Sequence, residues 1–213
     1  MVDITLLNGV QGAAHPTSKG NPMKKIFGKI SINAPVILGL TGISLIVLII
    51  NSLSGGRFNN AMGIYYTSIT DLTFYTRFFT HSIAHINMTH YAGNFLLILA
   101  IGPLIEEKYG SRYTLIALLI CSVVTGLVHV IFQPRVMLLG ASGIAFMLIL
   151  IGSFVNTSRG KIPLTFILVT VLYICNEIIA GITVHDNVSR VTHVIGGICG
   201  AACGWYWARR KSN

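Results

Sequence analysis

Long uninterrupted apolar stretches constrain this 213-residue sequence more than any other feature. A helix needs about 20 apolar residues to cross the hydrocarbon core of a bilayer, and several stretches come close to or reach that length. Only 10 % of the residues are charged, against about 25 % in soluble domains. The sequence therefore predicts an all-α polytopic membrane protein and excludes an ordinary water-soluble globule.

Hydropathy divides the chain into six expected membrane spans. They run from about Pro35 to Leu53, from Met88 to Ile101 and a little beyond, from Tyr113 to Phe132, from Ala141 to about Val155, from Pro163 to about Ile182 and from Val191 to Ala208. A polar, aromatic-rich connection from Ser54 to about His85 separates the first two spans, and Asn87 is placed to cap the second. The charged sequence from Glu106 to Arg112 predicts a turn before the third span.

The spans define the expected domain organisation. We expect an N-terminal cytoplasmic tail over residues 1–34, a six-helix membrane domain over 35–208 and a basic C-terminal cytoplasmic tail over 209–213. Residues 1–22 are polar and are expected to be flexible. Met23, which two lysines follow, would also make a natural start, so the sequence leaves open whether these 22 residues are native.

The distribution of positive charge predicts how the chain is oriented. The N-terminal segment, the second and fourth loops and the C-terminus hold 11 Lys and Arg residues, whereas the other three connections hold four. Cytoplasmic loops collect positive charge, so both termini are expected inside. The net charge of +9 is explained by this orientation, and no nucleic-acid partner is expected.

The fourth span is too short to cross the membrane. From Ala141 to Val155 it covers about 22 Å, less than the hydrocarbon core of about 30 Å. If it starts at the inner face, the loop Gln133 to Gly140 must dip below the outer surface. Irregular backbone at that depth is tolerated only inside protein or beside water. We therefore expect a partly sunken fourth helix beside a cavity open to the outside.

Polar residues from three spans are expected at this depth. Ser142 opens the fourth span, His193 lies in the first turn of the sixth, and His90 and Asn94 share one face of the second. A serine hydroxyl is a weak nucleophile until an imidazole accepts its proton, and the resulting oxyanion needs hydrogen-bond donors. These are the parts of a serine hydrolase. Asp186 is the only acidic residue close before His193, which favours a Ser–His dyad over a triad.

These residues belong to a longer set of motifs. The set comprises Arg77, His81-x3-His85-x4-His90-x3-Asn94, Glu106-x3-Gly110-Ser111, Gly140-x-Ser142-Gly143 and His193-x2-Gly196-x3-Gly200. In this order, over roughly residues 70 to 208, it resembles the rhomboid family of intramembrane serine proteases. The resemblance implies a six-transmembrane-helix rhomboid-like bundle. It also implies cleavage of transmembrane segments in single-pass membrane proteins, with membrane lipid around the enzyme and no metal or other cofactor.

The resemblance also implies roles for individual residues. Ser142 would be the nucleophile and His193 the general base, while His90, Asn94 and the backbone N–H of Ser142 would form the oxyanion hole. Structural positions would be taken by Arg77, His81, His85, Glu106, Gly140, Gly143, Gly196 and Gly200. The fifth helix and the loop after it would form the substrate gate. The active site would open to the extracytoplasmic side of a bacterial inner or plasma membrane.

The chain departs from the family pattern at one position. Many bacterial members place a tyrosine on the third span to stack against the catalytic imidazole, and this chain has Leu127 there. The sequence therefore leaves open what positions the ring of His193.

A row of glycines predicts how the sixth span packs. Gly196, Gly200 and Gly204 recur every four residues and form a smooth ridge on one face of the helix. Such ridges let two helices approach closely in lipid. The fourth span is the expected partner, which would bring Ser142 and His193 together.

The remaining polar residues in or near the spans are expected to have simpler roles. Glu177 is expected to contact water or the gate, and His129 and His185 are expected to be ordinary solvated residues near loop ends. The four cysteines lie in apolar stretches without a CxxC pair, which favours packing over disulfides or zinc.

Two alternative functions stay open. One is a catalytically silent rhomboid-like protein that binds transmembrane segments, although such relatives characteristically lack the serine or the histidine. The other is a His-ligated membrane metal enzyme or transporter, because His81 and His85 have ligand spacing and His90 adds a third imidazole. No His-Glu-x-x-His motif supports it.

Overall fold

The structure is a computed structural model that describes residues 32–155, 161–162, 164–165, 167–168, 170–172, 175 and 190–210. The described helices all lie in one compact unit, Asn33–Asn213. The expected fifth span, Pro163 to Ile182, lies mostly outside the described residues. Glu177, His185, Asp186 and the tail 1–22 lie wholly outside them.

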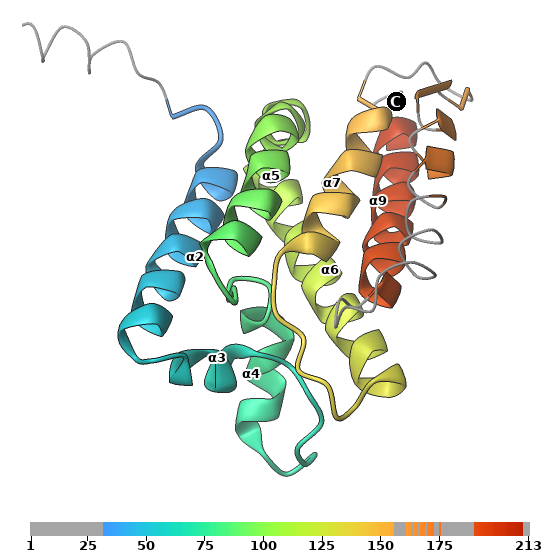
Figure 1. Ribbon diagram of the computed structural model, residues 1–213. Helices are drawn as coiled ribbons and strands as arrows, with labels where there is room; N and C mark the ends of the chain where they lie inside the picture. Colours follow the sequence, from blue (N-terminus) through green and yellow to red (C-terminus); the bar gives the residue numbers. More distant parts are fainter. Residues whose placement is uncertain are drawn as a thin grey trace, which may run out of the picture. The chain divides into compact units, whose positions relative to one another are not determined.

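The described residues are arranged as a helical bundle, as predicted. The helices are α2 (Pro35–Leu53), α3 (Arg57–Met62), α4 (Leu72–Thr80), α5 (Met88–Tyr109), α6 (Ser111–Phe132), α7 (Ser142–Ser153) and α9 (Arg190–Arg210). Figure 1 shows α2, α5, α6, α7 and α9 as the bundle, with the short α3 and α4 at its lower end. Strand-like pairing in the described part is limited to a single bridge between Ile64 and Leu138.

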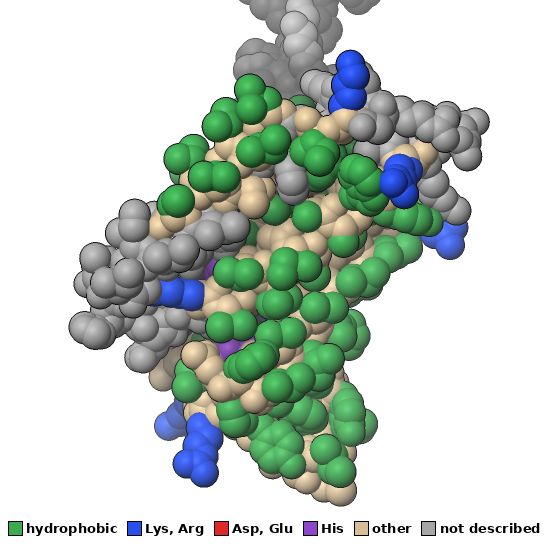
Figure 2. Space-filling model, turned by 90° about the vertical axis from the view of Figure 1, so that its right-hand side faces the viewer, with side chains coloured by type: hydrophobic (Ala, Val, Ile, Leu, Met, Phe, Trp, Pro, Cys, Tyr) green, Lys and Arg blue, Asp and Glu red, His purple; other side chains and the backbone are tan. Residues whose placement is uncertain are grey.

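Three of these helices are long and apolar enough to cross a membrane. They are α2, α5 and α6, with mean hydropathies of 2.4, 1.4 and 2.6 over their most apolar stretches. Only 28 %, 33 % and 39 % of those stretches are buried inside the protein. Figure 2 shows hydrophobic side chains spread over the described part of one face. Apolar surfaces of this size, left exposed in the described part of the chain, indicate contact with lipid.

The helix bounds correct one expectation about the loops. The N-cap at Asn87 is confirmed, because its side chain accepts the backbone N–H of His90 at 2.8 Å. The prediction of a turn from Glu106 to Arg112 is wrong, since α5 continues through Pro103 to Tyr109 and α6 begins at Ser111. Gly110 alone separates them, with a φ of 90° that favours glycine.

Glu106 is used to cap a different helix. Its two carboxylate oxygens accept the backbone N–H groups of Val36 and Ile37, each at 2.9 Å, in the first turn of α2. These N–H groups have no partner inside their own helix, and a negative charge is favourable at a helix N-terminus. Glu106 is 2 % exposed, so its carboxylate fixes the start of α2 against the end of α5.

This contact predicts a stability effect. Glu106→Ala should lower the free energy of unfolding by about 2–3 kcal/mol, because one buried and one partly buried N–H group lose a charged acceptor. Glu106→Gln should lose about half as much, since one amide oxygen remains. The thermal unfolding midpoint in detergent micelles measures both, with the exposed neighbour Glu107→Ala as the matched control. Equal midpoints for all three variants would contradict the capping role.

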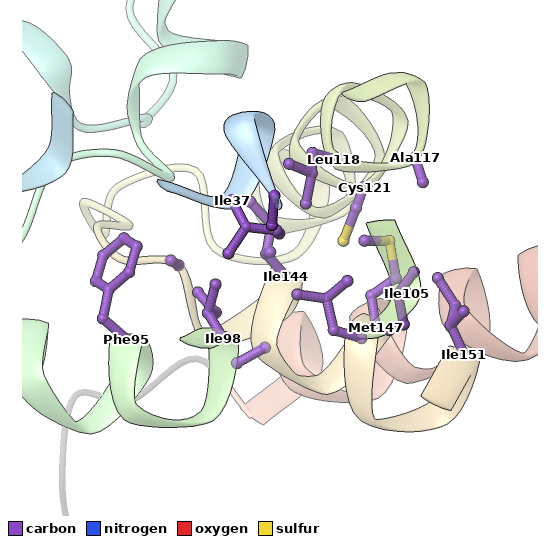
Figure 3. Packing of buried hydrophobic residues seen from close by; sticks show 14 of the residues in the cluster. Ile37, Phe95, Ile98, Ile105, Ala117, Leu118, Cys121, Ile144, Met147 and Ile151 are labelled. Atoms are coloured by element: carbon purple, nitrogen blue, oxygen red, sulfur yellow. The ribbon is translucent and has the colours of Figure 1, made fainter. Parts of the chain in front are cut away.

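The core of the bundle is built around α7. Apolar side chains from α2, α5 and α6 converge on it, and Figure 3 shows Ile144, Met147 and Ile151 of α7 among them. With 12 residues, α7 is about 18 Å long, whereas the 22 residues of α5 and α6 each give about 33 Å. Helix α7 therefore begins part-way along its neighbours, and residues 133–141 run beside the bundle to reach it (Figure 1).

Candidate active site

The four side chains predicted to carry the chemistry line one cavity of about 470 Å³. His90 and Asn94 come from α5, Ser142 from α7 and His193 from α9. The remaining lining residues are Ile86, Leu97, His129, Met137, Leu138, Leu139, Ala145 and Phe146. Ser142 and His193 are both partly exposed, so their polar groups can be reached from this space.

Close packing of α7 against α9 brings Ser142 and His193 together. A Cβ added to Gly196 would collide with the backbone carbonyl of Gly143, and one added to Gly143 would lie 3.5 Å from the Thr192 carbonyl. Gly143 follows Ser142 and Thr192 precedes His193, so the immediate neighbours of the two residues lie close to each other. The predicted glycine ridge on the sixth span does face the fourth.

The residues just before Ser142 are held by the histidines of the connection before α5. The N–H of Gly140 donates to the carbonyl of His81 at 2.9 Å, and that of Ala141 donates to His85 Nε2 at 3.3 Å. Gly140 has a φ of 120°, and a Cβ there would lie 2.6 Å from the ring of His90. Glycine is thus required twice at position 140, for its backbone conformation and for the approach of His90.

His85 links Ala141, the residue before Ser142, to Asn94 of the predicted oxyanion hole. Its Nε2 accepts from Asn94 Nδ2 at 3.1 Å as well as from Ala141. Burial, and next the nearby His90, lower the pKa of His85 to about 4. The ring is therefore neutral near pH 7, and with Nε2 accepting, its proton is on Nδ1.

His81 has the opposite tautomer. Its buried ring lies with Nε2 at 3.0 Å from the carbonyl of Ser122, so Nε2 carries the proton and donates. Burial is also the main cause that lowers the pKa of His81 to about 4. The two histidines expected to be structural are therefore buried as neutral rings that tie the connection before α5 to α6 and α7.

These two pKa values predict that acid destabilises the protein. An unfolded imidazole has a pKa of about 6.5, so between about pH 6.5 and 4 the unfolded chain binds more protons than the folded one. Each neutral ring makes its full contribution to the free energy of unfolding above about pH 6.5, and this contribution is lost as the pH falls towards 4. The loss amounts to about 3 kcal/mol per ring. Thermal unfolding in detergent across this range measures the slope. His81→Gln, which keeps a donor for Ser122, should show a shallower slope, and an unchanged slope would contradict this assignment.

Phe146 is the aromatic residue that contacts the ring of His193. It lies one turn after Ser142 on α7, and its ring centroid is 4.8 Å from that of His193, with the planes at 45°. Leu127 is 48 % exposed on α6 and does not line the cavity. The question that Leu127 left open is therefore answered by α7, which supplies the aromatic ring beside His193.

This contact gives a prediction for the dyad. Phe146→Ala should lower the rate of the proposed cleavage about tenfold to a hundredfold, because small displacements of a catalytic group are costly. Phe146→Tyr should keep most of the rate, since it retains a ring in the same place. Initial rates on a membrane-embedded reporter measure both, and an alanine variant as fast as the tyrosine variant would contradict the role.

His129 also departs from expectation. Its place in the sequence predicts a solvated residue near a loop end, yet it is 1 % exposed and its Nε2 lies 2.8 Å from the carbonyl of Val136. The sequence carries no sign of this, because the burial arises only when the following turn folds the loop back over the end of α6. Arg77 is likewise buried, with its guanidinium 4.5 Å from the ring of Tyr65.

No group of three or more His, Cys, Asp or Glu side chains in the described part of the chain is arranged to hold a metal ion. His81, one of the histidines that suggest a metal by their spacing, is instead hydrogen bonded to the carbonyl of Ser122. His85 is hydrogen bonded to the amide of Asn94 and the N–H of Ala141. The metal-enzyme alternative gains no support from this geometry.

The family model of the rhomboid domain matches residues 73–210. The chain belongs to the rhomboid family. Together with its apolar helices, this membership makes it an integral membrane protein. Rhomboid proteins are generally serine proteases that act on membrane proteins, and the family also includes inactive members, so activity depends on the site. A comparison with curated proteins finds no match.

Proposed function

We propose that this rhomboid is an intramembrane serine endopeptidase that cleaves transmembrane segments of single-pass membrane proteins. The observation that supports this most strongly is the cavity shared by Ser142, His193, His90 and Asn94. These side chains come from three helices, and together they supply a nucleophile, a base and two donors. An inactive member has no need to keep the complete set in one cavity.

The proposed reaction uses the dyad twice. His193 takes the proton of the Ser142 hydroxyl as its oxygen attacks the peptide carbonyl. The tetrahedral intermediate collapses when His193 gives that proton to the leaving amine, which leaves an ester on Ser142. A water then attacks the ester, His193 takes its proton, and the second collapse returns a proton to Ser142 and releases the new carboxyl end.

The donors for the oxyanion are the backbone N–H of Ser142 and the side chains of His90 and Asn94. Ser142 is the first residue of α7, so its N–H has no partner within the helix and lies at the positive end of the helix dipole. The contact with His85 holds the amide of Asn94 in place. Donors fixed before the reaction stabilise developing charge without reorganising.

We propose that the cavity faces the outer side of the membrane. This orientation follows from the distribution of Lys and Arg, which puts both termini inside. The cavity opens where α5, α7 and α9 begin, and water from that side would serve the second step. A substrate helix would reach it from the lipid between α5 and the fifth span, most of which lies outside the described residues.

The test is cleavage of tagged single-pass reporters by the purified protein in liposomes. We expect cleavage that a fluorophosphonate inhibits and that a metal chelator leaves unchanged. Loss of cleavage with the chelator and its recovery with zinc would instead favour the metal enzyme. Reporters that co-purify with the protein but stay intact would favour a silent binding protein.

A further inference from the structure

The segment that connects α6 to α7 forms one wall of the cavity. Met137, Leu138 and Leu139 line the space directly, three to five residues before Ser142. A peptide in the cavity must therefore contact this segment as well as the dyad. How the segment is held decides the shape that the peptide meets.

Main-chain hydrogen bonds hold the two ends of this segment. Ile64 and Leu138 exchange two bonds, with N···O distances of 3.1 and 2.9 Å, and the N–H of Tyr66 donates to the carbonyl of Pro134 at 2.9 Å. The N–H of Gly140 donates to the carbonyl of His81. A substitution leaves such main-chain bonds in place.

One side chain adds to these bonds in the middle of the segment. His129 Nε2 lies 2.8 Å from the carbonyl of Val136, and because a carbonyl can only accept, Nε2 carries the proton. The imidazole also lines the cavity beside Met137. Val136 immediately precedes the three lining residues, so this bond fixes where the cavity wall begins.

We propose that His129 is a positioning residue for substrate binding, acting through residues 137–139. The inference rests on the proposed protease function. Ser142 has separate anchors, since Gly140 and Ala141 are held by His81 and His85. Leu138 also keeps its two bonds to Ile64. Loss of the His129 bond therefore loosens the cavity wall at Val136 and Met137 and leaves the dyad and oxyanion hole in place.

The experiment compares four variants in the full chain. His129→Ala and His129→Asn remove the bond, since the asparagine amide is too short to reach Val136. His129→Gln keeps a donor at nearly the position of Nε2. Leu127→Ala, on the exposed face of the same helix, is the matched control. For each variant, KM and kcat are measured on a single-pass reporter, and the labelling rate of Ser142 is measured with a fluorophosphonate, which needs only the dyad and its donors.

We expect KM to rise about tenfold in His129→Ala and His129→Asn, with labelling within about twofold of the wild type. His129→Gln and Leu127→Ala should match the wild type in both assays. If His129→Ala fails to fold, the glutamine and asparagine variants decide, and equal KM values for these two would overturn the proposal. Labelling that falls in parallel with cleavage would also overturn it, because His129 would then act on the dyad. A wild type that is never labelled contradicts the protease function instead.

Discussion

Ser142→Ala and His193→Ala should each lower the cleavage rate at least about a thousandfold. The serine variant lacks the atom that forms the ester, and the histidine variant lacks the group that takes its proton. Because the two act as one unit, the double variant should be no slower than either single variant. The assay is cleavage of a tagged single-pass reporter in liposomes, with Leu127→Ala on the exposed face of α6 as a control.

Both variants should remain folded, which separates this effect from loss of structure. Ser142 and His193 are only partly buried and line an open cavity, so truncation leaves no sealed void. Thermal unfolding midpoints close to that of the wild type are expected for both. Cleavage within about tenfold of the wild type by either variant would contradict the dyad.

Gly196→Val should also abolish cleavage, for a different reason. A Cβ at this position would overlap the backbone carbonyl of Gly143. Backbone cannot rotate away as a flexible side chain can, so α9 must move from α7 and carry His193 away from Ser142. We expect a loss of more than about a hundredfold, since a displacement of about 1 Å can have that effect.

Gly42→Val on α2 is the matched control, because a Cβ there has nothing within 4 Å. The chemical change is identical, and both positions lie inside long helices of the bundle. The control should cleave within about twofold of the wild type, as expected of a lipid-facing substitution. Wild-type cleavage by Gly196→Val would show that the glycine ridge does not set the spacing of the dyad.

The parts of the site that the sequence could predict depend on spacing within one element. Asn87 precedes the helix that it caps, and the glycines of α9 recur at the period of a helical face. The polar residues near the start of α5, α7 and α9 could be placed at one end of the bundle because charge gives the direction of each span.

The parts that it could not predict depend on contacts between distant elements. Glu106 caps α2 from about 70 residues away, whereas the charged residues around it suggest a turn. His129 is buried only because the loop after α6 folds back over it. Phe146 faces His193 through the rotation of α7 against α9, which an apolar run without clear periodicity does not specify.

The most direct measurement of the central proposal is labelling of the purified wild-type protein with a fluorophosphonate, followed by peptide mapping of the modified residue. The proposal predicts a single adduct on Ser142, which forms at least about a hundredfold more slowly in His193→Ala because no base takes the hydroxyl proton. An adduct on another residue, or equal labelling with and without His193, would contradict it.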